Sequence, residues 1–292
     1  MNRRIGRTID AVLNPKDYPP FPDMTTAESF RRAWQDNPMW VFACMAHAAY
    51  GEPADMQPLF NGFGAATRFY ESRADNSPVI RGRQAFLSVW PDKAILSFRG
   101  TEGAETIRLK TPGALRAAAE KIGWALPEDL DTFLATDILD DLDFKVTPYL
   151  KSRVHNGFLK ATLDLWPAIE DDLVALCAPS HMPIFVTGHS LGGAMALIAG
   201  MTYPFERIVT FGAPRVGQDI QRTIAEPSRH IRYVNGNDPV PRMIPTFYPF
   251  LYRHHGELRT IVDQNHGGPN VLYDHSIVNY AEVLRETLPS DT

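Results

Sequence analysis

Residues 183–194 leave the chain few ways to fold, because a Gly-x-Ser-x-Gly motif there joins an apolar run to a run of small residues. The run 184–187 is typical of a buried strand, and residues 191–203 are typical of a helix. A serine between them must sit on a strained turn if its hydroxyl is to project from the strand end, and Gly188 and Gly192 remove side chains that would collide there. The motif therefore predicts a strand–turn–helix unit with Ser190 as a nucleophile.

The pattern around this motif predicts an α/β fold. From about residue 157 the chain alternates between helix-like and strand-like segments, which is typical of βαβ units around a parallel sheet. We expect helices over 158–176, 191–203 and 217–225, and strands over 184–187, 207–211 and 231–234. Upstream, we expect helices over 25–35 and 38–50 and strands over 67–71, 85–90 and 94–98. Downstream, we expect strands near 251–253 and 258–262 and a final helix over 274–288.

A serine nucleophile needs a histidine base and an acid that orients the histidine, and on such a scaffold both follow the serine in the chain. Asp238 comes shortly after the predicted strand ending at 234, and the two nearby prolines, Pro239 and Pro241, should hold it rigidly. It is the predicted acid. Asp219 and Asp263 are weaker candidates, because neither follows a parallel strand at the end that would face the site.

Four histidines follow Asp238, and we predict that His275 is the base. It lies between the loop 265–270 and the apolar-striped final helix, where a loop can deliver an imidazole to the strand ends. His255 stands at a strand start and is expected to be structural, and His266 is expected to be solvated. His254 is left as a minor alternative. His189 should point away from the reactive side of the turn.

The negative charge of a tetrahedral intermediate needs preorganised N–H donors. One predicted donor is the backbone N–H of Leu191, the residue after the nucleophile. The second should come from a loop after an earlier strand, and the segment 96–101 ends such a strand in a glycine turn. Thr101 is the predicted second donor.

The composition excludes several other classes of protein. Lys and Arg number 29 against 34 for Asp and Glu, a net charge of −5 that supplies no basic face for nucleic acid. No run approaches the about 20 apolar residues of a membrane helix, and the N-terminus lacks the apolar stretch of a cleavable secretory signal. Cys44 and Cys177, both flanked by apolar residues, are expected to be buried free thiols, which favours a reducing compartment.

A length of 292 residues allows one or two domains. Without a linker or internal repeat, we expect one domain over 1–292, with a proline-rich extended arm over 1–24. Residues 111–122 and 127–134 read as two short amphipathic helices within the segment 102–136. We predict that this segment is a lid that covers the Ser190 cleft in water and turns toward lipid at an interface; the alternative is a static cover.

Seven motifs in this order resemble the fungal-type class 3 lipases over about residues 39–284. They are Ser97-Phe98-Arg99-Gly100-Thr101, Asp137-Ile138-Leu139-Asp140-Asp141-Leu142, Val154-His155-Asn156-Gly157-Phe158, Gly188-His189-Ser190-Leu191-Gly192-Gly193-Ala194, Phe211-Gly212-Ala213-Pro214-Arg215-Val216-Gly217, Asn237-Asp238-Pro239-Val240-Pro241-Arg242 and Asp274-His275. The resemblance implies an α/β-hydrolase fold, a mostly parallel central sheet flanked by helices, and hydrolysis of carboxylic esters. It places the nucleophile, acid and base on Ser190, Asp238 and His275, and the first-loop oxyanion donor on Thr101.

Two features depart from that family. Its secreted fungal members carry disulfides and a signal sequence, and neither is expected here, so the chain is predicted to be cytoplasmic or exported without a cleavable signal. The segment 102–136 is longer than the usual one, which implies an enlarged helical lid insert.

The sequence therefore predicts a serine hydrolase of lipid esters that forms an acyl-enzyme, uses no metal or organic cofactor and contacts a lipid interface transiently. An acylglycerol lipase is the main interpretation. The alternatives are a phospholipase A1, which could be an exported effector, and an esterase of small or aromatic esters. A more remote alternative is a catalytically silent α/β-hydrolase domain that binds lipid or a protein partner.

Overall fold

The computed structural model describes residues 14–72, 84–100, 145–242, 244, 246, 251–262 and 271–286. Several predicted features lie outside these ranges: the oxyanion residue Thr101, the insert 102–136, Asp263 and His266. Residues 14–24, the described part of the predicted arm, include a short 3-10 turn at Pro15–Asp17 and bury Phe21 and Met24.

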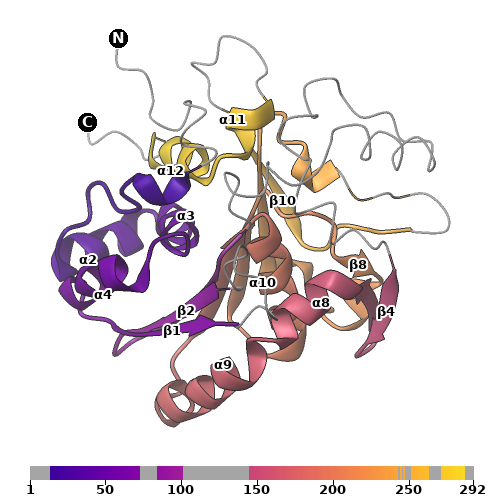
Figure 1. Cartoon of the computed structure of the whole chain (residues 1–292), viewed down its shortest axis with the longest axis horizontal. Coiled ribbons are helices and arrows are strands. Elements are labelled where there is room, and N and C mark those ends of the chain that lie inside the picture. The colour runs from indigo at the N-terminus through magenta and orange to yellow at the C-terminus, as the bar shows by residue number, and fades with distance from the viewer. Residues whose placement is uncertain are drawn as a thin grey trace.

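A seven-stranded sheet forms the centre of the described structure (Figure 1). Its strands occur in the order β1 (Ala66–Glu71), β2 (Gln84–Val89), β3 (Ala94–Phe98), β6 (Ile184–His189), β7 (Arg207–Phe211), β9 (His230–Asn235) and β10 (Glu257–Ile261). The strands β3, β6, β7, β9 and β10 run parallel, while β1 and β2 are antiparallel to their neighbours. The mostly parallel sheet confirms the predicted fold class. Because parallel strands end together, the carboxyl ends of β6, β7 and β9 meet at one edge.

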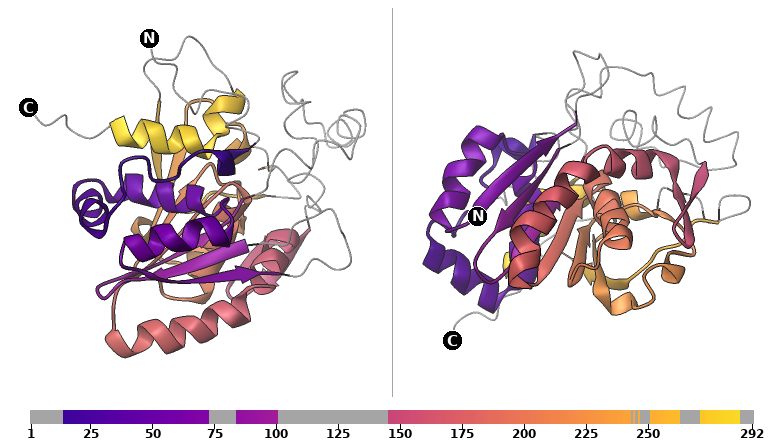
Figure 2. Two further views of the ribbon diagram at one scale, coloured as in Figure 1. Left: turned by 60° about the vertical axis from the view of Figure 1, so that its left-hand side comes forward. Right: turned by 90° about the horizontal axis from the view of Figure 1, so that it is seen from below.

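Helices cover both faces of the sheet, as Figures 1 and 2 show. On one face, α3 (Pro38–Ala48) and α12 (Ile277–Glu286) share a core cluster with Val209 and Phe211 of the sheet. On the other, α8 (Asn156–Leu163) and α10 (Leu191–Thr202) share a second cluster with Val186 and Ile208. The first layer also includes α2 (Ala27–Asp36) and α4 (Pro53–Gly62), of which α4 was not expected from the sequence. The adjacent β7 residues Ile208 and Val209 thus face different helical layers, which explains why both are apolar and buried.

The predicted helix over 158–176 is broken in the structure. The helix α8 ends at Leu163, α9 begins at Trp166 and ends at Asp172, and a π turn covers Leu173–Cys177. Pro167 explains the break, because proline lacks the N–H of a helix interior and its ring clashes with the carbonyl four residues earlier. In this structure Pro167 lies in the first turn of α9, where a backbone N–H has no partner within the helix and no preceding turn meets the proline ring.

The predicted helix over 217–225 is wrong. Gly217–Gln218 forms the strand β8, which pairs with β5 (Ser152–His155) in a small second sheet that also contains β4 (Val146–Tyr149). Only a 3-10 turn follows, at Ile220–Arg222. A Cβ at position 217 would overlap the backbone of Arg153, so only glycine allows β8 to pair this closely with β5. A helix at these residues could not form this pairing.

Two other segments near the C-terminus differ from the expectation. The strand expected near 251–253 is reduced to a single bridge between Arg253 and Gly217. The final helix begins earlier than expected, as α11 (Val271–His275), and restarts after Ser276 as α12. This break places His275 at the end of a short helix, held apart from the long one.

The helix α10 packs unusually close to the sheet because three of its residues are glycines. A Cβ on Gly192 would overlap the carbonyl of Phe98 in β3, and one on Gly193 would lie 2.7 Å from the Cβ of Ala213. The start of α10 therefore touches the carboxyl ends of its neighbouring strands directly, which fixes the turn before it.

We expect Gly192→Ala to lower the free energy of unfolding by about 2 kcal/mol or more, because the added methyl group must displace backbone. Gly62→Ala is the matched control. Its Cβ would lie 3.9 Å from the Thr25 carbonyl at the exposed end of α4, so stability should be unchanged or rise by up to about 1 kcal/mol. Urea denaturation measures both, and equal stabilities for the two variants would contradict the close packing of α10.

Candidate active site

Ser190 occupies the turn between β6 and α10 with φ 56° and ψ −125°, a conformation that costs free energy for a residue other than glycine. Its N–H donates to the Phe211 carbonyl at 3.0 Å, and its carbonyl accepts from Gly193 at 3.0 Å. The turn thus has the strained backbone that the sequence motif predicts. Leu191, the predicted N–H donor, is the first residue of α10, directly after Ser190.

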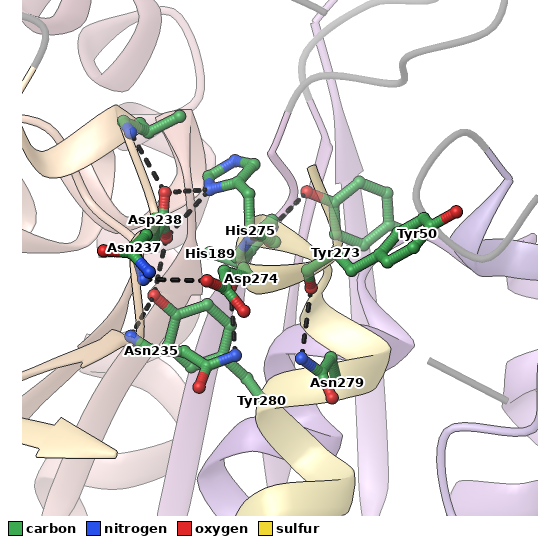
Figure 3. Close-up of polar contacts among 11 residues, drawn as sticks. Tyr50, His189, Asn235, Asn237, Asp238, Tyr273, Asp274, His275, Asn279 and Tyr280 are labelled. Atoms are coloured by element: carbon green, nitrogen blue, oxygen red, sulfur yellow. Dashed lines mark hydrogen bonds and ion pairs between the residues drawn. The ribbon is translucent and has the colours of Figure 1, made fainter. Parts of the chain in front are cut away.

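Asp238 and His275 contact each other at the end of β9, although 37 residues separate them in the chain (Figure 3). The His275 Nδ1 lies 2.9 Å from Oδ1 and 3.0 Å from Oδ2 of Asp238, and both side chains are buried. A carboxylate only accepts hydrogen bonds, so the ring must donate from Nδ1. In the neutral ring the lone pair is then on Nε2, the state that a general base requires.

The end of β7 brings Ser190 and the Asp238–His275 pair to one place. Phe211 accepts the hydrogen bond from the Ser190 N–H, and the next residue is Gly212, with φ 57°. A Cβ at position 212 would lie 2.6 Å from Asp238 Oδ2 and 3.0 Å from His275 Nδ1. The three predicted residues therefore converge at the carboxyl ends of β6, β7 and β9.

Two further donors satisfy the Asp238 carboxylate. Tyr280 of α12 donates its hydroxyl to Oδ2 at 2.6 Å, and the backbone N–H of Val240 donates to Oδ1 at 3.0 Å. Burial, together with the nearby Asp238 charge, holds the pKa of Tyr280 well above its ordinary value, so the phenol remains a donor. The same phenol oxygen accepts from the N–H of Asn235 at 2.9 Å.

Three further residues belong to the site although no role was predicted for them from the sequence: Tyr280, Tyr50 and Asp274, the last of which was named only within the Asp274-His275 motif. Asp274 accepts from the N–H of Asn237 at 2.7 Å and so fastens the turn that precedes Asp238. Tyr50, in the turn after α3, bonds to His189 at 2.8 Å. One signal was available for Tyr280: a tyrosine on the apolar face of the final helix needs a partner for its hydroxyl.

Of the other histidine candidates, the structure describes His254 and His255. His255 Nε2 lies 3.0 Å from the Ile224 carbonyl, and its Nδ1 lies 3.4 Å from that of the buried His230. Burial and the charge of Arg232 lower the pKa of His254 to about 3. Among the acids, Asp219 is 45% exposed in its side chain and lies 3.6 Å from Arg222 at the surface.

In the part of the chain that the structure describes, no three His, Cys, Asp or Glu side chains are grouped as a metal site would require. None of its helices is long and apolar enough to cross a bilayer. Cys44 and Cys177 are both buried and free, and burial raises the pKa of Cys177 to about 11.

Comparison with known proteins gives one family and one fold. The sequence profile described as Lipase (class 3) matches residues 95–248. The secreted mono- and diacylglycerol lipase 1 of Fusarium solani is 40% identical over 117 residues, 35% of this chain and 32% of that protein. The toxin TseL of Vibrio cholerae is 30% identical over 188 residues, 57% of this chain and 28% of that protein. These matches thus span about a third of each curated relative.

Among solved structures, the chain is similar to the Rhizomucor miehei lipase in its complex with its propeptide. The TM-score is 0.53 at 18% identity, covering 84% of this chain and 77% of that one. At this identity the likeness supports the fold, an α/β-hydrolase sheet with helices on both faces.

We expect Tyr280→Phe to lower the free energy of unfolding by about 2–3 kcal/mol, because a buried carboxylate oxygen loses a donor. Tyr149→Phe is the control, since it removes a neutral hydrogen bond of 2.8 Å to Thr202 and should cost about 1 kcal/mol. Urea denaturation at pH 7 compares them. Equal losses in the free energy of unfolding would contradict a stabilisation of the buried Asp238 carboxylate by the Tyr280 hydroxyl.

Proposed function

The chain belongs to the class 3 lipase family, since the family profile covers more than half of it, and we propose that it is a serine hydrolase of lipid esters. The observation that carries the proposal is the buried Asp238–His275 contact, which lies beside the strained turn of Ser190 at one edge of the sheet. A hydroxyl, an oriented imidazole and a buried carboxylate are the groups that acyl transfer through an acyl-enzyme requires.

In the proposed mechanism, the Ser190 hydroxyl attacks the ester carbonyl while His275 Nε2 takes its proton. Asp238 holds the ring and stabilises the imidazolium. The backbone N–H of Leu191 and a donor from Thr101 would stabilise the oxyanion. His275 then gives its proton to the leaving alcohol, which departs and leaves the acyl group on Ser190. Water, deprotonated by His275, then attacks this ester, and His275 returns the proton to the Ser190 oxygen as the acyl–oxygen bond breaks, which releases the carboxylic acid and regenerates the Ser190 hydroxyl and the neutral ring.

The substrate that we propose first is an acylglycerol. The Fusarium solani relative is named as a mono- and diacylglycerol lipase, and its match is the more identical of the two curated relatives described above. The hydrolysis would need only a lipid interface as a transient partner and no metal or organic cofactor.

A phospholipid is the second candidate, and the likeness to the toxin TseL favours it. That match covers 57% of this chain against 35% for the Fusarium lipase. Phospholipids are the main esters that a toxin meets in the membrane of a target cell. If this chain acts in that way, we expect it to have phospholipase A1 activity.

Ser190→Ala and His275→Ala should each lower kcat by roughly 10⁴-fold or more with the fold retained, and the double variant should be no worse, because the groups act as a unit. Ser228→Ala and His181→Ala, at positions exposed to solvent, are the matched controls and should keep wild-type turnover. Hydrolysis of a short soluble ester measures all of them. A folded Ser190→Ala protein that keeps more than about a tenth of the activity would overturn the proposal.

A substrate panel decides between the two lipid classes. We expect the kcat/KM of the wild-type chain to be at least about tenfold higher for emulsified diacylglycerol than for vesicles of phosphatidylglycerol or phosphatidylcholine. The opposite ratio, with release of the sn-1 acid, would establish the phospholipase. Activity confined to short soluble esters would contradict both lipid proposals and indicate an esterase.

A further inference from the structure

The hydroxyl of Tyr50 lies where three segments of the site meet. It lies 2.8 Å from Nδ1 of His189, the residue before the proposed nucleophile, and Nε2 of the same ring lies 2.7 Å from the main-chain carbonyl of His275 (Figure 3). All three residues are buried. A chain of two hydrogen bonds thus joins the end of α3, the turn at Ser190 and the backbone of the proposed base.

The direction of both hydrogen bonds follows from the chemistry of the groups. A carbonyl oxygen only accepts, so His189 donates to His275 from Nε2. Burial and, secondarily, the charge of His275 hold the pKa of His189 well below its ordinary value, so the ring is neutral. A neutral ring with its proton on Nε2 has a lone pair on Nδ1, and Tyr50 must therefore donate its O–H there. The tyrosine fixes the tautomer of His189.

Gly100, after β3, brings a further segment to the Tyr50 hydroxyl. A Cβ at this position would overlap the Tyr50 hydroxyl and would lie 2.6 Å from the His189 carbonyl. Gly100 follows β3 and directly precedes Thr101, the proposed oxyanion donor. The backbone at Gly100, directly before Thr101, therefore packs against the Tyr50 hydroxyl, which also sets the tautomer of His189.

We propose that Tyr50 is a positioning residue: through His189 it holds the main chain of His275, and through Gly100 it supports the start of the oxyanion loop. The inference rests on the proposed serine hydrolase function. Tyr50 lies outside residues 95–248, the part matched by the family profile, so the N-terminal helical layer would be part of the catalytic scaffold and not only a cover for the sheet.

The expected effect is on rate. A displacement of about 1 Å between a base and a nucleophile can cost roughly 100-fold in rate, whereas binding of a small ester depends little on it. Tyr50→Phe removes only the hydroxyl. We expect kcat for a short soluble ester, per folded molecule, to fall by about 10- to 100-fold while KM stays within about twofold.

Tyr70→Phe is the matched control. Tyr70 is also buried, and its hydroxyl donates to Asp172 at 2.8 Å, between β1 and α9. This variant loses a hydrogen bond of the same length that lies outside the site, so it should also lower the unfolding temperature but keep the wild-type kcat. The folded fraction of each protein, measured by urea denaturation under assay conditions, normalises the rates.

Substitutions at His189 test whether Tyr50 acts on His275 through the His189 ring. The amide nitrogen of Gln can replace His Nε2 as a donor to the His275 carbonyl, whereas Leu cannot donate. His189→Gln should therefore be at least about tenfold more active per folded molecule than His189→Leu, which should resemble or fall below Tyr50→Phe. Equal kcat for the Gln and Leu variants would exclude the His275 backbone as the point of action.

The outcomes separate this inference from the proposed function. If Ser190→Ala is inactive while Tyr50→Phe keeps wild-type kcat, or loses no more than Tyr70→Phe, the positioning role is wrong and the hydrolase proposal stands. If Ser190→Ala is as active as wild type, the proposed function fails first. A large loss of kcat at unchanged KM in Tyr50→Phe alone supports the inference.

Discussion

The structure depends on the burial of one carboxylate. Asp238 is fully buried at the end of β9, and a charge removed from water is costly unless hydrogen-bond donors replace the lost solvent. Three donors surround it: the imidazole of His275, the phenol of Tyr280 and the N–H of Val240. Two of them come from the C-terminal elements α11 and α12, so these must lie against the strand ends. The placement of the base thus follows from the need to satisfy the acid.

The contacts around the acid and base also join two helices that lie far apart in the chain, α3 and α12. The helix α12 carries Tyr280 and packs beside α3 in the core cluster of one sheet face. Tyr50, just after α3, reaches His189 and through it the backbone of His275. Tyr280 thus ties α12, and Tyr50 the turn after α3, to the acid and base, and both helices bury apolar surface in the same core cluster. In such surroundings a hydrogen bond is electrostatically stronger than it is in water.

The sequence was sufficient for features that local pattern determines. The β6–turn–α10 unit, the strand β7 and the position of Asp238 after β9 follow from apolar runs, glycine spacing and chain order. It was insufficient where distant residues decide. Gly217 becomes a strand because β5, more than 60 residues earlier, pairs with it, and Pro167 starts a helix that periodicity alone joins to α8. Tyr50 lies 139 residues from His189, and no local pattern indicates that contact.

In the proposed mechanism, the Asp238–His275 pair activates Ser190. Labelling with a fluorophosphonate followed by peptide mapping tests it most directly, because the reagent needs an activated hydroxyl and marks the residue that supplies it. We expect a single phosphonylated residue, Ser190, and labelling slower by roughly 100-fold or more in folded Asp238→Asn, whose amide disfavours the required tautomer. Label on another residue, or equal labelling rates for Asp238→Asn and the wild type, would contradict it.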